Sequence, residues 1–192
     1  VMRETGRDAI VIETVAGMLD ASLAACGPRG ERRVTVDMGP AKLDWREIPL
    51  AEAQDTNHVA LALGPLKDPV AVSMGNPHAV FFVDNAEAVD VAGLGPVLER
   101  HSLFPERANI EIVQVLGPER LRMRVWERGV GITQACGTGA CAVVVAAARR
   151  GLTGRHATVV LDGGELDIEW LQDGHVLMTG PVAVSFTGEI AE

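Results

Sequence analysis

The sequence has few cysteines and no cluster of basic residues. Its three cysteines, Cys26, Cys136 and Cys141, form no C-x-x-C pair, and an odd number argues against a disulfide framework. Lys and Arg together number 17 against 26 Asp and Glu, so the net charge is −9. Without concentrated positive charge, the chain is not expected to bind nucleic-acid phosphates.

Long apolar runs and metal-ligand spacings are also lacking. No stretch reaches the length of a membrane span, and the first residues show no signal-peptide pattern. The five histidines have no ligand spacing and are not grouped with cysteine as a zinc site requires, so we expect no metal. With 47% hydrophobic and 22% charged residues, the 192-residue chain is expected to be globular. These features predict a reduced, cytoplasmic protein that binds neither nucleic acid nor membrane.

The chain is organised around a cysteine that precedes a glycine-rich turn and an apolar segment. Cys136 is followed by Gly137-Thr138-Gly139, and residues 140–148 are small or apolar before two arginines and a glycine at 149–151. Cations in the last turn and a final glycine are typical of a helix end, so a buried helix is predicted here. The N-terminus of a helix presents free N–H groups and partial positive charge, which can lower a thiol pKa from about 8.5 to roughly 3.5–7.5.

This arrangement predicts a reactive sulfur beside a cradle for a carboxylate or phosphate, since flanking glycines let an anion approach the backbone closely. Cys136 is therefore expected to be the fast-reacting thiol of the three. Cys141 would lie inside the apolar helix, and Cys26, before Gly27-Pro28, would lie outside any positive helix end. The alternative is that Cys136 is a buried structural cysteine before an ordinary helix.

An internal repeat is visible as three short matches that occur in the same order in two parts of the chain: residues 5–9 with 153–157, 19–20 with 166–167, and 38–40 with 179–181. They predict a duplicated unit of helix, strand, turn, strand and Gly-Pro. In the second copy the Cys136 helix lies directly before the repeat, so the equivalent helix would lie directly before Val1. We therefore expect that an upstream helix, with a second Cys-Gly motif, has been cut away.

The remaining pattern is rich in strands. Strands are predicted at 8–15, 34–38, 43–49, 59–63, 70–74, 79–83, 109–116, 121–126, 158–160, 166–170, 176–178 and 182–186. Residues 86–102 favour a helix that is broken near Gly93 and Gly95-Pro96. The expected architecture is α/β, with many strands around one or two buried helices.

Polar residues interrupt these strands at three places. Asn76 and His78 occupy a tight turn, Asn109 begins a strand, and Glu127-Arg128 ends the strand that leads toward Cys136. Amides and an arginine suit a substrate that carries carboxylate and amino groups, and an imidazole or carboxylate can bias the protonation of a nearby thiol. The alternatives are an ordinary turn histidine, a common turn asparagine before proline, and an exposed strand-end ion pair.

Taken together, four motifs resemble the diaminopimelate epimerase family. They are Gly75-Asn76-Pro77-His78-Ala79-Val80, Arg107-Ala108-Asn109, Trp126-Glu127-Arg128-Gly129 and Ala135-Cys136-Gly137-Thr138-Gly139-Ala140-Cys141. The resemblance covers the whole chain. It implies a duplicated α/β epimerase fold of two domains, each a mixed β-sheet or barrel around a central helix, with a cleft between them.

The resemblance also implies an activity. It predicts a cofactor-independent isomerase that interconverts LL- and meso-diaminopimelate in lysine and peptidoglycan-precursor synthesis, commonly as a homodimer. Cys136 would be one of two catalytic cysteines, Gly137 and Thr138 would hold the α-carboxylate, and His78 and Glu127 would tune the cysteines. The substrate-binding side chains would be those of Asn76, Asn109, Glu127 and Arg128.

The implied domains are a remnant of the N-terminal domain at 1–39, the C-terminal domain at 40–180, and a closing strand at 181–192, with Phe186 near the expected dimer contact. The first cysteine is expected to be missing with the upstream portion, so this chain would be inactive by itself. Two other functions remain open: another two-cysteine racemase, such as one acting on proline, or a non-catalytic remnant that binds an amino acid or a partner.

Overall fold

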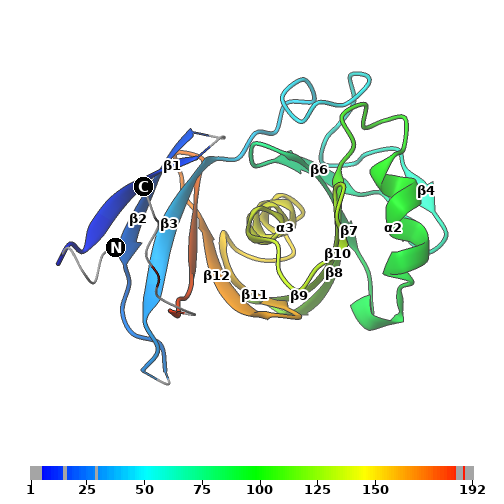
Figure 1. The fold of residues 1–192 in the computed structure, drawn as a ribbon. Helices are drawn as coiled ribbons and strands as arrows, with labels where there is room; N and C mark the ends of the chain where they lie inside the picture. Colours follow the sequence, from blue (N-terminus) through cyan, green and yellow to red (C-terminus); the bar gives the residue numbers. More distant parts are fainter. Residues whose placement is uncertain (1–5, 15–16, 29, 185–187, 189–192) are drawn as a thin grey trace.

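The computed structural model describes residues 6–14, 17–28, 30–184 and 188, and it consists of one long curved sheet around a central helix (Figure 1). The sheet order is β1-β2-β3-β13-β12-β11-β9-β8-β7-β6, with β10 also pairing with β9. The strands are β1 Ala9–Thr14, β2 Gly17–Leu23, β3 Arg33–Pro40, β6 Val70–Ser73, β7 Pro77–Phe82, β8 Asn109–Gly117, β9 Arg120–Glu127, β10 Gly131–Ile132, β11 His156–Leu161, β12 Gly164–Trp170 and β13 His175–Pro181. Outside it lie a small β4 Ala62–Leu63 and β5 Leu66–Lys67 hairpin, the 3₁₀ turn η1 Ala86–Ala88, and helix α2 Val91–Glu99.

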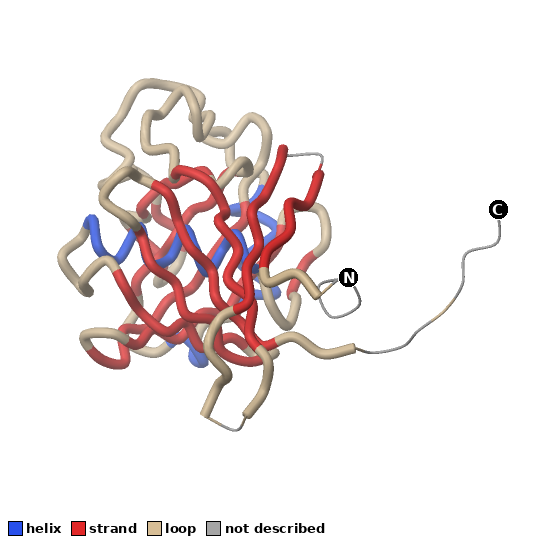
Figure 2. The backbone as a smooth tube through the Cα atoms, turned by 90° about the vertical axis from the view of Figure 1, so that its left-hand side faces the viewer, coloured by secondary structure: helices blue, strands red, loops and turns tan. Residues whose placement is uncertain are grey.

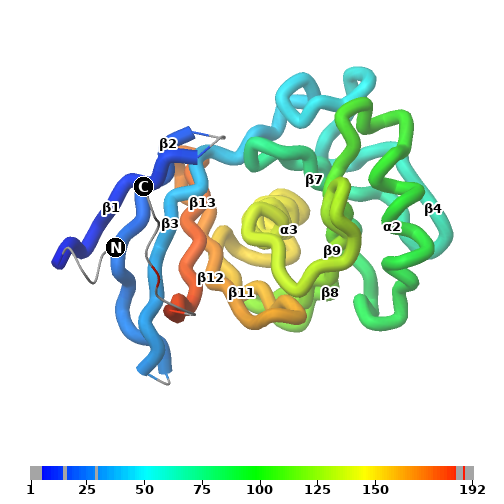
Figure 3. The backbone as a smooth tube through the Cα atoms, viewed as in Figure 1, coloured from blue at the N-terminus to red at the C-terminus, as the bar shows by residue number. Residues whose placement is uncertain are grey.

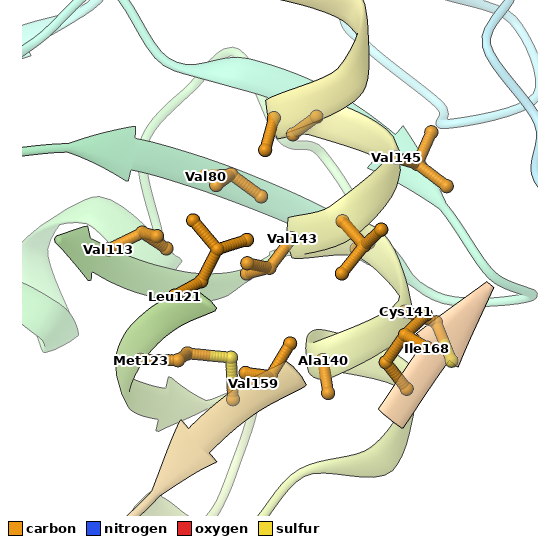
Figure 4. Packing of buried hydrophobic residues seen from close by; sticks show 14 of the residues in the cluster. Val80, Val113, Leu121, Met123, Ala140, Cys141, Val143, Val145, Val159 and Ile168 are labelled. Carbon is orange, nitrogen blue, oxygen red and sulfur yellow. The ribbon is translucent and has the colours of Figure 1, made fainter. Parts of the chain in front are cut away.

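The central helix is α3, Gly137–Arg149, and it confirms the helix predicted after Cys136. Strands β6–β9 and β11–β13 curve around it, so that Figure 1 looks down its axis, whereas Figure 2 shows it lengthwise behind the strands. Valine and alanine side chains cover every side of the helix, and residues 139–147 are all buried. A helix that is apolar all round needs a core on every side. The curved sheet supplies that core, with Leu121, Val159 and Ile168 among the contacting residues (Figure 4).

The repeat seen in the sequence corresponds to two similar three-stranded antiparallel units. One is β1–β2–β3 and the other is β11–β12–β13. The last strands of the two units pair antiparallel with each other, from Arg33 opposite Pro181 to Pro40 opposite His175. This reciprocal pairing of equivalent strands is the geometry expected of a duplicated unit whose copies are related by an approximate twofold axis.

Outside the curved sheet, α2 packs against β8 and β9 and encloses a second apolar cluster that includes Phe81, Leu98 and Phe104. The predicted break near Gly93 and Gly95-Pro96 is wrong, since α2 runs through all three residues. The interruption comes earlier, at Asp90, whose side chain accepts from Gly93 N and caps the helix. Gly95 serves the packing instead, because a Cβ there would lie 2.6 Å from the Trp126 ring.

Three of the predicted strands also differ from the structure. Residues 43–49 form turns, because the Asp44 side chain accepts from Arg46 N and its carbonyl accepts from Ile48 N. In 59–63, Ala62–Leu63 alone is a strand. The last predicted strand, 182–186, is not formed at 182–184, and the rest of it, including Phe186, lies outside the described residues. The other predicted strands are present over the residues that the structure describes.

Candidate active site

Cys136 is the N-cap residue of α3 and the centre of the candidate site. Its backbone is extended, and its sulfur accepts a hydrogen bond from Gly139 N at 3.4 Å, in the manner of a capping side chain. Figure 3 shows the chain running from the end of β9 into this helix start. The N–H groups of Gly137 and Thr138 belong to the first turn and have no partner within the helix. The structure therefore places the sulfur and free backbone donors together, as predicted.

A chain of hydrogen bonds leads from this cysteine to the turn between β6 and β7. The Cys136 sulfur lies 3.6 Å from Thr138 Oγ1, which accepts from Asn76 Nδ2 at 3.3 Å. The other end of the same amide, Asn76 Oδ1, lies 3.0 Å from His78 Nε2. Gly75 makes this turn possible, since its φ of +94° is a conformation that favours glycine. Four of the predicted site residues thus contact one another in series.

The next residue in the series is Glu111, which the sequence analysis missed. Its Oε1 lies 2.7 Å from His78 Nδ1, and both side chains are completely buried. Glu111 is in β8, where it faces α3 while Ile110 and Ile112 face the second cluster. A carboxylate within a strand that is buried on both faces was the available signal, because a buried charge needs a partner or a function.

The predicted lowering of the Cys136 pKa is wrong for this structure. Burial raises the pKa of the Cys136 thiol to about 12, with the Glu111 carboxylate as the second cause. The Thr138 hydroxyl and the Gly139 N–H act in the opposite direction but are weaker, and Glu127 adds a smaller upward contribution. Desolvation and a neighbouring negative charge both disfavour a thiolate. At neutral pH Cys136 is therefore a neutral thiol, suited to donate a proton rather than to accept one.

Thiol labelling of this chain should reverse the order that the sequence suggested. Cys26 is exposed, Cys136 is 6% exposed, and Cys141 is fully buried with a pKa that burial also raises to about 12. Because the thiolate is the reacting form, iodoacetamide at pH 7 should modify Cys26 first, Cys136 much more slowly and Cys141 last. Peptide mapping by mass spectrometry against time measures this order. Labelling of Cys136 before Cys26 would show that its thiol is ionised in the native chain.

The remaining predicted residues form a second group around Arg128. Asn109 is 3% exposed and links two segments, since its Nδ2 donates to Pro77 O at 3.0 Å and its Oδ1 accepts from Arg128 N at 2.9 Å. The guanidinium of Arg128 donates to Glu106 O at 3.0 Å. Glu127 accepts a short hydrogen bond from the Thr133 hydroxyl. Asn109 therefore holds Arg128 next to the Asn76 turn, with one acceptor and one donor position of its amide still available.

A cavity of about 280 Å³ lies between this arginine and the turn. Gly75 and Pro77, which flank Asn76, line it together with Arg128. Lys42 and Arg46 also line it, and neither was predicted. Lys42 reaches the cavity because its backbone pairs with Ser73 at the end of β6. Glu47 and Glu106 line it as well, so the residues around the cavity include charges of both signs, as a carboxylate and an ammonium group would require.

Comparison with known proteins agrees with the motifs. The diaminopimelate epimerase family matches residues 70–185, which include Asn76, His78, Glu111, Arg128 and Cys136. The chain is 64% identical over 188 residues to a diaminopimelate epimerase of Rhodospirillum centenum, covering 98% of this chain. It is 57% identical over 193 residues to one of Phenylobacterium zucineum, covering 98% of this chain and 68% of that protein.

The chain belongs to the diaminopimelate epimerase family. It spans 63% of the length of the Rhodospirillum centenum relative. Among solved structures, a PhzF-family phenazine biosynthesis protein of Bacillus anthracis covers 94% of this chain and 69% of its own, with a TM-score of 0.63 and 15% identity. A hydroxyproline epimerase of Agrobacterium vitis covers 90% of this chain and 56% of its own, with a TM-score of 0.61 and 16% identity. These likenesses establish the α/β epimerase fold that the resemblance implied.

Proposed function

We propose that this chain is the Cys136-bearing part of a cofactor-independent epimerase that interconverts LL- and meso-diaminopimelate, in the synthesis of lysine and peptidoglycan precursors. The observation that carries the proposal is the Cys136 sulfur at the N-terminus of α3, hydrogen-bonded within a series of buried and half-buried polar groups. The curated relatives of this family support the choice of substrate. The metabolic setting and a homodimeric assembly belong to the same proposal.

The chemistry requires a proton to leave one face of the α-carbon and another to arrive on the opposite face. Cys136, as a neutral thiol, is the proton donor on its side. The N–H groups of Gly137 and Thr138 would bind the α-carboxylate, and their partial positive charge would stabilise the carbanion in a site from which water is excluded. A second thiol, on the opposite face, would take the first proton.

Neither of the other two cysteines is placed to be that second thiol. Cys141 lies in the core within the same helix, and Cys26 is exposed on the segment between β2 and β3. The base must therefore come from a group that these three thiols do not provide. A proline-type racemase is less well supported, because its small cyclic substrate has no distal amino-acid end to occupy the Arg128 cavity.

Arg128 is proposed to bind the distal carboxylate of the substrate and to contribute little to stability. Its side chain makes a hydrogen bond to one exposed carbonyl, so Arg128→Met should leave the Tm within a few degrees. Diaminopimelate binding should weaken by about 1.5–3 kcal/mol, the range for hydrogen bonds to charged groups, or roughly 10- to 150-fold in Kd. Calorimetric titration would measure this in the chain joined to the unmatched part of the Rhodospirillum centenum relative.

The matched control is Arg120→Met, which removes an arginine whose exposed ion pair is with Glu165 on β12. It should change neither Kd nor Tm appreciably. An Arg128→Met protein that binds diaminopimelate as tightly as the Arg120→Met control would remove Arg128 from the site.

A further inference from the structure

Glu111 has no part in the function proposed above, yet it closes the series of polar contacts into a ring. From Glu111 the contacts run through His78, Asn76 and Thr138 to the Cys136 sulfur. The ring closes at Gly139, because a Cβ built there would lie 3.0 Å from Glu111 Oε1 and 3.1 Å from the Cys136 sulfur. The carboxyl oxygen and the sulfur therefore both lie against the position that a side chain of residue 139 would occupy, and the glycine there leaves that space open between them.

The hydrogen bonds also determine how many protons His78 and Glu111 share. Asn76 donates to Thr138 through its Nδ2, so its Oδ1 faces His78 Nε2 and must accept a hydrogen bond from the Nε2–H group. Either the His78 imidazole is neutral and the protonated Glu111 donates to His78 Nδ1, or the imidazole is protonated and Glu111 is ionised. In both states the pair carries one shared proton and no net charge, as a fully buried pair requires.

A second observation favours a shared proton. Glu111 Oε2 is buried and has no hydrogen-bond partner among the residues that the structure describes. A full negative charge on this carboxyl would leave that oxygen unsolvated, which is costly in a core. Consistently, burial raises the pKa of the Glu111 carboxyl, although the adjacent His78 lowers it.

We propose that Glu111 is a positioning residue of this site: with His78 it anchors the ring that orients Asn76 and Thr138, and it controls how readily Cys136 releases its proton. The inference rests on the proposed function for its meaning in catalysis. Two effects are combined. The ring holds the hydroxyl of Thr138 against the sulfur, and the carboxyl acts on the same sulfur directly across Gly139.

Other groups also surround the thiol. Glu127 at the end of β9 acts on it with the same sign as Glu111 but more weakly, and Cys141 lies one turn further along α3. The uncharged Met178 of β13 contacts Gly137, and β11 and β12 contribute Val159 and Ile168 to the apolar core around α3. Glu111 and His78 are therefore the fully buried ionisable groups that join β8 and β7 to the thiol.

The test is the pH dependence of Cys136 alkylation in the 192-residue chain, which requires no epimerase activity. Glu111→Gln keeps the shape and a donor for His78 but cannot ionise. As pH rises, the wild-type pair loses its proton and places a negative charge beside the sulfur, whereas the variant cannot. The variant should therefore react faster at alkaline pH, by roughly three- to tenfold, since a lower thiol pKa raises the thiolate fraction more than it reduces nucleophilicity. The ratio of variant to wild-type rates should grow with pH.

Two controls separate this effect from a loosened core. Cys141 labelling in the same samples reports opening of the helix and should stay unchanged. Glu99→Gln removes another buried carboxylate, one that accepts from Trp126 Nε1 on the far side of β9 and has no contact with Cys136. It should leave the Cys136 rates as in wild type. Equal Cys136 rates in Glu111→Gln and wild type at every pH, a slower variant, or a parallel rise at Cys141 would overturn the proposal. If the wild-type chain joined to the unmatched part of the Rhodospirillum centenum relative failed to epimerise diaminopimelate, that result would instead count against the proposed function.

Discussion

The 192-residue chain is expected to interconvert LL- and meso-diaminopimelate at least about a thousandfold more slowly than the Rhodospirillum centenum relative, since positioned acid–base groups contribute roughly 10²–10⁴-fold each. Inversion needs a base and an acid on opposite faces, and Cys136 supplies one of them. Cys141 is fully buried behind it, and Cys26 is exposed on another segment. With its pKa raised to about 12, Cys136 is also poorly suited to serve as the base by itself.

The measurement is the appearance of meso product from LL-diaminopimelate, followed together with deuterium uptake from heavy water. The purified chain should show neither, and Cys136→Ala should look the same. When the unmatched part of the Rhodospirillum centenum relative is supplied in trans, some turnover should appear with wild-type chain and none with Cys136→Ala. Turnover by the 192 residues at the rate of the longer relative would sink the two-thiol mechanism.

The central helix and its cysteine could be predicted because their signals are local. An apolar run after Gly-Thr-Gly can form a helix only inside a core, and α3 has that position. The strands β8 and β9 were equally clear, since Leu121, Met123 and Val125 alternate with outward residues. The repeat was readable for a related reason, because short turn and Gly-Pro sequences mark the same points in β1–β3 and β11–β13.

What the sequence did not show depends on contacts between distant segments. The break expected at Gly95 follows from the low helix propensity of glycine. In the structure the helix continues, and the glycine is needed because the Trp126 ring packs where a side chain would be. Likewise, the charge state of Cys136 depends on Glu111, 25 positions earlier in the chain, which β8 brings beside the helix start. The local sequence indicated a positive helix end that would lower the thiol pKa, whereas burial and the Glu111 carboxylate raise it.

Among the described residues, no helix has the length and apolar character to cross a bilayer.

The second large effect concerns the helix that carries Cys136. Val144→Asp is expected to unfold the chain at neutral pH but to leave a folded population near pH 4. Val144 is 0% exposed at the middle of α3 and lies in the core cluster around that helix. Burial raises a carboxyl pKa by up to 3–5 units above its ordinary value of about 3.9, so the folded state holds the proton that the unfolded state has lost.

The direction of the pH effect follows from that difference. Below about pH 4 both states of the variant bind the proton, and the substitution costs only the burial of a neutral polar group, about 1–3 kcal/mol. Between pH 4 and 7 the unfolded state loses the proton first, so stability falls by about 1.4 kcal/mol per pH unit, or about 4 kcal/mol in total. The sum approaches the roughly 5–15 kcal/mol that holds a whole domain together.

Urea unfolding at pH 4 and pH 7, with each variant compared with wild type at the same pH, measures this loss. Val144→Asn introduces a polar group that does not titrate, so its destabilisation should be similar at both pH values. Val130→Asp places the same carboxylate at a position that is 74% exposed after β9 and should leave the midpoint nearly unchanged. Only a dry core around α3 makes the Asp and Asn variants diverge as pH rises. Equal losses of stability in the Asp and Asn variants at both pH values would mean that water reaches the helix. Water would then also reach the buried position of Cys136, whose burial keeps the thiol protonated.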